Sequence, residues 1–393
     1  MLRRLLAHAT EHSPRWQQRS DRSWTRLDQF PVTSRAWVRD QAEHEGALHA
    51  RDEWGEAIRS QTSGSSGQPL RFWTCATAAL VNQFLYSAQS LYLERDLSRQ
   101  KTVVSTKEVA KTAHEHWPEL LGRLFATGPA RIVEWRGQTI ASLAEQLGGE
   151  DWGYLACPGS VAAGLCDYYE TRQIPHPRAI EFITRSNAVS PQLRQRVRRL
   201  FGARVSDTYS CEELGPIAFE CAHSEGHYHV ALSNVIVEVV DGNGRHCAPG
   251  QPGCVLLTGL NNLATPFIRY DIGDIAALSP ACPCGWAGPT LTHLHGREVS
   301  LLKLPNGERI YFLLYATEWL PIAPILEYRL TQDRIDHLRV ELVAAERLSD
   351  TQRSAIVELV QSRSSTDCAV TIEQVDAIDW GTGHKRNEVV CLV

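Results

Sequence analysis

Short apolar runs alternate with stretches of helical periodicity between residues 95 and 185 of this chain. The runs at 102–105 and 130–133 have the composition of strands, and the apolar residues of 140–147 recur at helical spacing. This alternation is typical of βα units, whose strands lie parallel because each helix crosses back over the sheet. The sequence therefore predicts an α/β fold with a largely parallel sheet in this region.

The pattern then changes from βα units to hairpins. Ser190 and Pro191 are favoured at a helix start, and Gly202 is favoured just after a helix end, so a helix is expected between them. Beyond residue 206 strands dominate, for example 235–240, which precedes an Asp-Gly-Asn-Gly turn at 241–244. We therefore expect antiparallel pairing to follow the parallel part.

Length and pattern divide the chain into three parts. A chain of 393 residues is long enough for two or three domains. Residues 1–60 are polar and rich in Arg and Trp, and they are expected to form an irregular, partly helical opening region of the large domain. Residues 61–297 would be its core.

The third part, residues 298–393, has the pattern of a small α+β domain. Strands are expected at 337–344 and 368–375, on either side of a helix at 349–363. A domain of this size is within the usual range.

Net charge and hydropathy exclude several classes of function. The formal net charge of -5 argues against wholesale nucleic-acid binding, and the basic run at 194–199 is explained as one solvated helix face. No apolar run reaches the roughly 18–20 residues of a membrane span. His8, Glu11 and His12 interrupt the start of the chain, where a secretory signal would need an apolar stretch. The protein is therefore expected to be cytoplasmic, with no membrane partner.

A segment rich in hydroxyl groups and glycine carries the strongest chemical signal. It consists of Thr62, Ser63, Gly64, Ser65, Ser66 and Gly67, followed by Gln68 and Pro69. The N–H and O–H groups of such a backbone can surround phosphate oxygens. The segment is not the P-loop of kinases, since no Gly-Lys-Ser/Thr follows it. Taken alone, it could also be a flexible linker.

Two later segments combine aromatic and acidic residues. Tyr209 precedes Glu212 and Glu213, and an aromatic ring beside carboxylates can stack on a base and hold a divalent cation. The apolar run that begins at 266 ends in a Gly-Asp pair, whose carboxylate, Asp274, can face ribose hydroxyls. Each segment alone could be a solvated turn.

Two cations lie further along the chain. Arg297 is next to the predicted domain boundary, and Lys385 is in the glycine-flanked segment 381–386. A lysine in such a segment is a candidate for neutralising a carboxylate as it meets a phosphate. Most lysines, however, are ordinary surface residues.

In this order and spacing the segments resemble the acyl-adenylate-forming (AMP-binding) superfamily, and within it the phenylacetate–CoA ligase-like branch. The resemblance covers roughly residues 60–390. It implies an adenylate-forming ligase with a large N-terminal domain of stacked sheets and helices and a small, mobile C-terminal lid at 298–393. It further implies that ATP activates a carboxylic acid as an acyl-adenylate, with release of pyrophosphate.

The same resemblance assigns roles to the nucleotide-facing residues. Residues 62–67 would cradle the ATP phosphates, and Tyr209 would lie against the adenine. Glu213 would coordinate Mg²⁺, although the neighbouring Glu212 stays an alternative because the family's Ser/Thr before the acidic residue is here itself a glutamate. Asp274 would bind the ribose hydroxyls.

The remaining roles come with departures from the family pattern. Arg297 would contact the nucleotide near the hinge, and Lys385 would drive adenylation. Where the family's phosphate loop often continues Pro-Lys, Leu70 and Arg71 follow here, so Arg71 is a candidate for the missing charge. Ser300 stands where a hinge Asp or Lys is expected.

The acid and the acceptor are less constrained. The resemblance implies a small, aromatic acid, and the strand-to-helix junction at 154–160 is a candidate lining of its pocket. Coenzyme A is the implied acceptor, with the phosphopantetheine arm of an acyl carrier protein and an amine as alternatives. The candidate basic patch for the phosphates of coenzyme A consists of Arg194, Arg196, Arg198 and Arg199.

Two functions of other classes stay open. A catalytically silent nucleotide-binding or interaction protein would explain the departures from the pattern, and a phosphotransferase would release ADP. The sequence does not decide the oligomeric state, and a homodimer is possible.

Two clusters of metal-ligating residues stand about sixty residues apart. Cys282 and Cys284 offer two thiolates from one tight turn, and an earlier Cys/His cluster can complete the four N and S ligands of structural zinc. Some relatives carry zinc at matching positions, which favours the set Cys221, His227 or His229, Cys282 and Cys284. The alternative is a reduced, metal-free turn.

Overall fold

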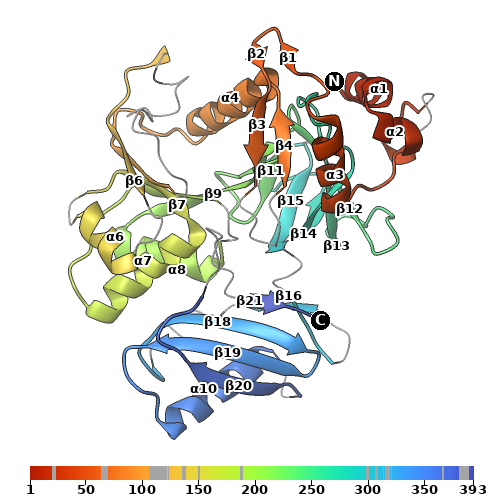
Figure 1. Ribbon diagram of the computed structural model, residues 1–393. Helices are drawn as coiled ribbons and strands as arrows, with labels where there is room; N and C mark the ends of the chain where they lie inside the picture. The colour runs from red at the N-terminus through yellow and green to blue at the C-terminus, as the bar shows by residue number, and fades with distance from the viewer. Residues whose placement is uncertain are drawn as a thin grey trace. The chain divides into compact units, whose positions relative to one another are not determined.

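The computed structural model describes residues 1–19, 24–62, 70–105, 122, 124–134, 139–148, 151–185, 189–297, 301–305, 309–312, 314, 319, 321–364, 367–379 and 389–393. They divide into two compact units (Figure 1). The first contains Met1–Ala162 and His176–Leu294, and the second contains Ala163–Pro175 and His295–Val393. The predicted α/β class is confirmed, because sheets and helices alternate along the chain.

An 11-stranded sheet, counted over the described residues, forms the centre of the first unit (Figure 1). Its strand order is β12-β13-β14-β15-β11-β10-β9-β8-β7-β5-β6. The strands are β5 (Lys101–Ser105), β6 (Ala130–Glu134), β7 (Tyr154–Pro158), β8 (Glu181–Arg185), β9 (Arg204–Cys211), β10 (Gly215–Glu220), β11 (Tyr228–Val230), β12 (Val235–Val240), β13 (Pro252–Gly259), β14 (Tyr270–Ser279) and β15 (Thr290–Arg297).

The sheet has a parallel part and an antiparallel part, as the sequence predicts. Strands β6, β5, β7, β8 and β9 pair in parallel. From β9 onward the described pairings are antiparallel, including β9 with β10 and β12 with β13. The change follows from the connections, since parallel neighbours need a crossover whereas hairpins need only a turn.

The opening region is part of the first unit's core. It contains α1 (Leu2–His12), α2 (Pro14–Arg19), a 3₁₀ turn (Leu27–Gln29), α3 (Arg35–Glu45), the β1–β2 pair (Arg51–Asp52, Gly55–Glu56) and β3 (Ile58–Gln61). Trp16 and Phe30 are fully buried and pack with Ile268, which comes from the other end of the unit. The Thr33 amide donates to the Arg269 carbonyl at 3.0 Å. This region therefore reaches the segment that leads to Asp274.

The other helices of this unit are α4 (Ala76–Tyr92), α6 (Ile140–Leu147) and α8 (Pro191–Phe201), and α7 (Gly159–Arg172) runs across the division between the units. The predicted caps of α8 are confirmed: Ser190 Oγ accepts from the Leu193 amide, and Gly202 is left-handed. The longest of the described helices, α4, has 17 residues. Within the described ranges, no helix combines the length and apolarity that a membrane crossing requires.

The solvated-face interpretation of the α8 arginines is wrong for two of them. Arg194 and Arg196 are buried, and Arg194 Nη2 pairs with the buried Glu220 carboxylate at 2.7 Å. Arg198 is exposed and pairs with Glu225. Periodicity misplaces Arg194 because a guanidinium can enter a core when a carboxylate, here that of Glu220 on β10, neutralises it.

The second unit has its own sheet and core. Its elements are β16 (Leu301–Lys303), β17 (Arg309–Tyr311), β18 (Ile325–Arg334), β19 (His337–Ala344), α10 (Asp350–Arg363), β20 (Ala369–Gln374) and β21 (Val389–Cys391). Four of the strands pair in the order β20-β19-β18-β21. Ile356 and Val360 of α10 are fully buried with Leu338 and Val340 of β19. The Ser349 capping box fixes the start of α10.

Candidate functional site

A hairpin holds both ends of the proposed phosphate loop. Strand β3 pairs with β4 (Arg71–Thr74), and the segment 62–70 connects them. The Thr62 amide donates to the Leu70 carbonyl, and the Leu70 amide donates to Thr62 Oγ1, each at 2.9 Å. Thr62 is buried at this closure. The rest of the proposed loop, Ser63, Gly64, Ser65, Ser66, Gly67, Gln68 and Pro69, lies outside the described residues.

Two residues assigned to the nucleoside meet in the core of the same unit. Tyr209, on β9, donates from its hydroxyl to Asp274 Oδ2, on β14, at 2.7 Å. Both side chains are buried. Burial, together with the neighbouring Asp274 carboxylate, raises the pKa of Tyr209 well above its ordinary value. The phenol therefore stays a hydrogen-bond donor, and the structure brings together residues separated by 65 positions.

The two candidate magnesium ligands, Glu212 and Glu213, differ in burial. Glu212 is exposed, whereas Glu213 is buried in the turn between β9 and β10. Glu213 Oε1 accepts from the Tyr270 hydroxyl at 3.0 Å and lies 3.2 Å from Arg35 Nη1. Arg35 Nη2 also donates to Thr62 Oγ1 at 2.5 Å. Arg35 thus links Glu213 to the start of the phosphate loop.

The turn that carries Glu213 requires a glycine at its end. Gly215 has a φ of +72°, and a Cβ there would lie 2.3 Å from the Asn82 side chain of α4. No other residue combines that backbone angle with so close a contact at low cost. The glycine therefore allows α4 to approach the turn.

Arg269 supports the site without facing it. Its φ is +46°, a rare conformation for a residue with a side chain. Its guanidinium is almost fully buried, pairs with Glu238 at 3.2 Å and donates to the Phe30 carbonyl at 2.9 Å. These contacts fix the backbone just before Tyr270. We infer that the strained turn orients Tyr270 and, further along β14, Asp274.

Two sequence candidates cannot be placed in this geometry. Lys385 lies outside the described residues, and for Arg297 the structure describes only the backbone, at the end of β15. Sequence reasoning missed Arg35 and Tyr270 as partners of Glu213. The spacing of the motifs gives no signal for Arg35, which stands 178 positions from Glu213 in a region without a motif.

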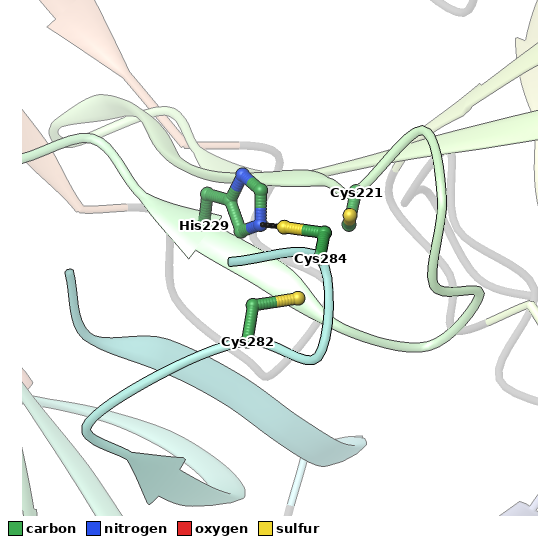
Figure 2. A group of neighbouring side chains, drawn as sticks. All are labelled: Cys221, His229, Cys282 and Cys284. Atoms are coloured by element: carbon green, nitrogen blue, oxygen red, sulfur yellow. Dashed lines mark hydrogen bonds between the residues drawn. The ribbon is translucent and has the colours of Figure 1, made fainter. Parts of the chain in front are cut away.

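Four metal-ligating side chains form a second cluster (Figure 2). The ligand atoms of Cys221, His229, Cys282 and Cys284 all lie within 4.8 Å of one another. His229 Nε2 and Cys284 Sγ are 3.4 Å apart. Figure 2 shows the three sulfur atoms and Nε2 directed toward a common centre, which is the arrangement a tetrahedral ion needs.

The surroundings of this cluster favour the ligand forms of Cys284 and His229, whereas burial raises the pKa of the Cys282 thiol. The Trp286 amide donates to Cys284 Sγ, which lowers the pKa of that thiol. Burial lowers the pKa of His229, so its imidazole is neutral near pH 7. Zinc binds thiolate sulfur and neutral imidazole nitrogen. The Trp286 ring also stacks on the His229 ring, with centroids 5.0 Å apart.

The two candidate histidines differ in position. His229 lies in β11 and faces the cysteines, whereas His227 is outside the group formed by the described residues. The His227 backbone closes the preceding turn: its carbonyl accepts from the Cys221 amide at 2.7 Å. His227 therefore shapes the turn from which Cys221 projects.

The fold is that of acyl-adenylate-forming CoA ligases. The structure aligns with a 2-hydroxyisobutyryl-CoA ligase in complex with 2-HIB-AMP at a TM-score of 0.74 and 18% identity, over 99% of this chain and 88% of that one. It aligns with the anthranilate CoA ligase AuaEII in complex with anthranoyl-AMP at a TM-score of 0.63 and 13% identity, over 89% and 68%. At these identities the likeness establishes the fold.

A sequence relative lies in the branch that the motifs suggest. The chain is 26% identical over 163 residues to a phenylacetate-coenzyme A ligase of Thermus thermophilus. The aligned part is 40% of this chain and 36% of that relative. No family model matches the chain. The predicted resemblance to the phenylacetate–CoA ligase-like branch of the superfamily is confirmed by these similarities.

Proposed function

We propose that this protein is an enzyme that uses ATP to activate a small carboxylic acid as an acyl-adenylate and then transfers the acyl group to coenzyme A. One observation carries the proposal. Thr62, Glu213 and Asp274 come from three separate motif segments and are buried in one unit. Each forms a hydrogen bond with a side chain of that unit, namely Arg35, Tyr270 and Tyr209. Phosphate, magnesium and ribose contacts are the roles that the family pattern gives these residues.

The proposed first step is an in-line displacement. A carboxylate oxygen attacks the α-phosphorus of ATP, the bond to the β-phosphate oxygen breaks, and pyrophosphate leaves with the electron pair. Glu213 has a buried carboxylate, and carboxylate oxygens are ligands that Mg²⁺ prefers. The ion would offset the negative charge of the phosphates. The positive charge of Lys385 would offset the repulsion between the carboxylate and the α-phosphate as they approach each other.

The proposed second step transfers the acyl group. The coenzyme A sulfur attacks the acyl carbonyl, a thioester forms, and AMP leaves. We propose that residues 298–393 act as the mobile lid that separates the two half-reactions. A carrier-protein phosphopantetheine would present the same thiol, and an amine would give an amide.

The candidate basic patch on α8 gives limited support to the choice of coenzyme A. Arg194 and Arg196 are buried, so they do not offer free charge to a phosphate. Arg198 is exposed but is paired with Glu225 at 2.8 Å. The preference for coenzyme A therefore rests on the resemblance to ligases that use it.

The proposed acid is small and aromatic, by analogy with the phenylacetate and anthranilate ligases. The 2-hydroxyisobutyryl-CoA ligase has a similar fold, so aliphatic acids belong in any substrate panel. Of the candidate lining, Tyr154 lies at the amino end of β7, where its hydroxyl accepts from the Asp96 amide. Pro158 is at the carboxyl end, beside Arg185, where ligands of parallel sheets bind.

Product analysis tests the proposed function. The protein would be incubated with ATP, Mg²⁺, coenzyme A and a panel of aryl and alkyl acids, and nucleotides and thioesters would be separated. We expect AMP, pyrophosphate and an acyl-CoA with one class of acid. Release of ADP would instead indicate a phosphotransferase, and AMP without a thioester would point to another acceptor.

We also propose that Cys221, His229, Cys282 and Cys284 hold a structural zinc ion. Cys221 directly follows β10 and His229 lies on β11, whereas the other two cysteines precede β15, the strand that pairs with β11. The ion would therefore tie neighbouring parts of the antiparallel sheet. Four protein ligands leave no open position for a substrate, so a role in catalysis is not expected.

The histidines at 227 and 229 provide a matched test of the zinc proposal. We expect one zinc per chain by elemental analysis, and His229→Ala should weaken zinc binding by more than about 100-fold, beyond the loss seen when only a supporting residue is removed. His227→Ala should keep the metal. Equal retention in both variants, or no zinc in the purified wild type after growth with zinc, would contradict this proposal.

A further inference from the structure

Arg35 contacts both Thr62, at the start of the proposed phosphate loop, and Glu213, the proposed magnesium ligand. Arg35 is the first residue of α3, whose start is fixed by Ser34 Oγ accepting from the Trp37 amide at 3.2 Å. One guanidinium nitrogen of Arg35 lies 3.2 Å from Glu213 Oε1, and the other donates to Thr62 Oγ1 at 2.5 Å. In the proposed function, the β- and γ-phosphates of a bound ATP have to lie between these same groups.

The alternative cation faces elsewhere. Arg71 Nε donates to Gln61 Oε1 at 3.2 Å across the β3–β4 hairpin, and Arg71 is exposed. Its side chain lines a cleft of about 210 Å³ together with Arg59, Trp73 and residues of α3. Because the described contact of its guanidinium is with Gln61, and not with Glu213 or Thr62, Arg71 is a poorer candidate than Arg35 for the lysine that the loop lacks.

The burial of Glu213 explains why a cation is needed there. The Glu213 side chain is 5% exposed, and an unpaired carboxylate at that depth is costly. The Arg35 side chain is 25% exposed, so its guanidinium reaches from solvent into the site. Its Nε is buried and has no hydrogen-bond partner among the described residues. The group thus has donor capacity left for a ligand.

We propose that Arg35 binds the pyrophosphate end of ATP and replaces the missing phosphate-loop lysine. This inference rests on the proposed adenylation function. In the nucleotide-free protein Arg35 neutralises Glu213. Glu213 would hold Mg²⁺ when ATP is bound, and the Arg35 guanidinium would then be free to donate to the β- and γ-phosphate oxygens.

The role is limited to one half-reaction. As the bond between the α-phosphorus and the leaving oxygen breaks, the electron pair goes to pyrophosphate, whose charge rises. A bidentate guanidinium offsets that charge and holds the leaving group in line. Pyrophosphate takes no part in acyl transfer to the thiol, so that step does not need Arg35.

The test compares Arg35→Ala and Arg35→Lys with the matched control Arg71→Ala. Calorimetry with magnesium pyrophosphate measures binding without turnover. Arg35→Ala should weaken this binding about 10- to 100-fold, as the loss of charged hydrogen bonds predicts. Arg35→Lys should bind between wild type and Arg35→Ala, since it keeps the charge and loses the fork. Arg71→Ala should stay within about fivefold of wild type, as expected for an exposed side chain.

Kinetics separate ligand binding from a structural role. Arg35→Ala should slow pyrophosphate exchange into ATP about 100- to 1,000-fold and raise KM for pyrophosphate, whereas transfer from supplied acyl-adenylate should stay near wild type. Equal loss of both half-reactions, or a larger effect from Arg71→Ala, would overturn the inference. If wild type showed no exchange with any acid and no binding of ATP, the adenylation proposal would fail, and the calorimetric comparison with magnesium pyrophosphate would still decide the role of Arg35.

Discussion

Replacing Lys385 by alanine is expected to abolish acyl-adenylate formation and to leave acyl transfer largely intact. The first step brings a carboxylate against a phosphate, and one well-placed cation in such a step is worth at least about 100- to 1,000-fold in rate. The second step starts from a neutral acyl carbonyl, so it does not need that charge. The two rates would be measured separately, by pyrophosphate exchange and by thioester formation from supplied acyl-adenylate.

A lysine elsewhere in the C-terminal part serves as the control. Lys303, on β16, donates to the backbone carbonyl of Val393. Lys303→Ala should change neither half-reaction by more than the change in folded fraction. If Lys385→Ala lowered both half-reactions equally, the assignment of Lys385 to adenylation would be wrong.

Replacing Arg95 by alanine should destabilise the first unit by about 3–5 kcal/mol, the usual cost of breaking a buried ion pair. Arg95 is 3% exposed and its partner, Glu181, is fully buried, with Arg95 Nε 3.0 Å from Glu181 Oε1. Arg95 also donates to Ser206 Oγ at 2.8 Å. Arg204, which forms the other ion pair with Glu181, is 47% exposed.

The Arg95–Glu181 ion pair also predicts how the free energy of unfolding changes with pH. Burial opposes ionisation of Glu181, but the Arg95 ion pair and the hydrogen bonds from Arg95 and Ser206 together outweigh it and lower the pKa of Glu181 below its ordinary value. The stabilisation is therefore present above the ordinary pKa of a glutamate and is lost as the pH falls through the folded-state value. In Arg95→Ala this loss should be smaller, because the pairing that lowers the pKa is gone.

Urea unfolding at several pH values measures the effect. The control is Arg99→Ala, since Arg99 pairs with Asp151 at the surface, with both side chains about half exposed. That change should cost no more than about 1 kcal/mol. If both variants lost a similar free energy of unfolding, burial would not determine how much the Arg95–Glu181 ion pair stabilises the protein.

The fold could be predicted where the signal is local. Alternation identified β5, β6 and α6, and the capping residues Ser190 and Gly202 fixed both ends of α8. The same periodicity failed for Arg194, because it registers polarity along one helix and does not detect the Glu220 carboxylate on β10. The core role of the opening region was missed for a similar reason, since its partners are more than 200 positions away.

In the candidate site, too, residue types could be predicted from local motifs, whereas contacts between distant segments could not. The motif residues Tyr209, Glu213 and Asp274 were chosen by order and type, and the structure brings Tyr209 and Asp274 into contact. The contacts of Glu213 with Arg35 and Tyr270 were not predictable, because they depend on how α3 and β14 pack. The choice of His229 over His227 depends on where β11 begins, which two-residue spacing alone does not define.

The decisive test of adenylation is the exchange of labelled pyrophosphate into ATP, with Mg²⁺ and a panel of acids but without coenzyme A. Adenylation is reversible and needs no acceptor, so we expect exchange that depends on one class of carboxylic acid. That result would establish the reaction and identify the substrate class together. No exchange with any acid, combined with no binding of ATP, would contradict the account and favour a protein that has the fold without the activity.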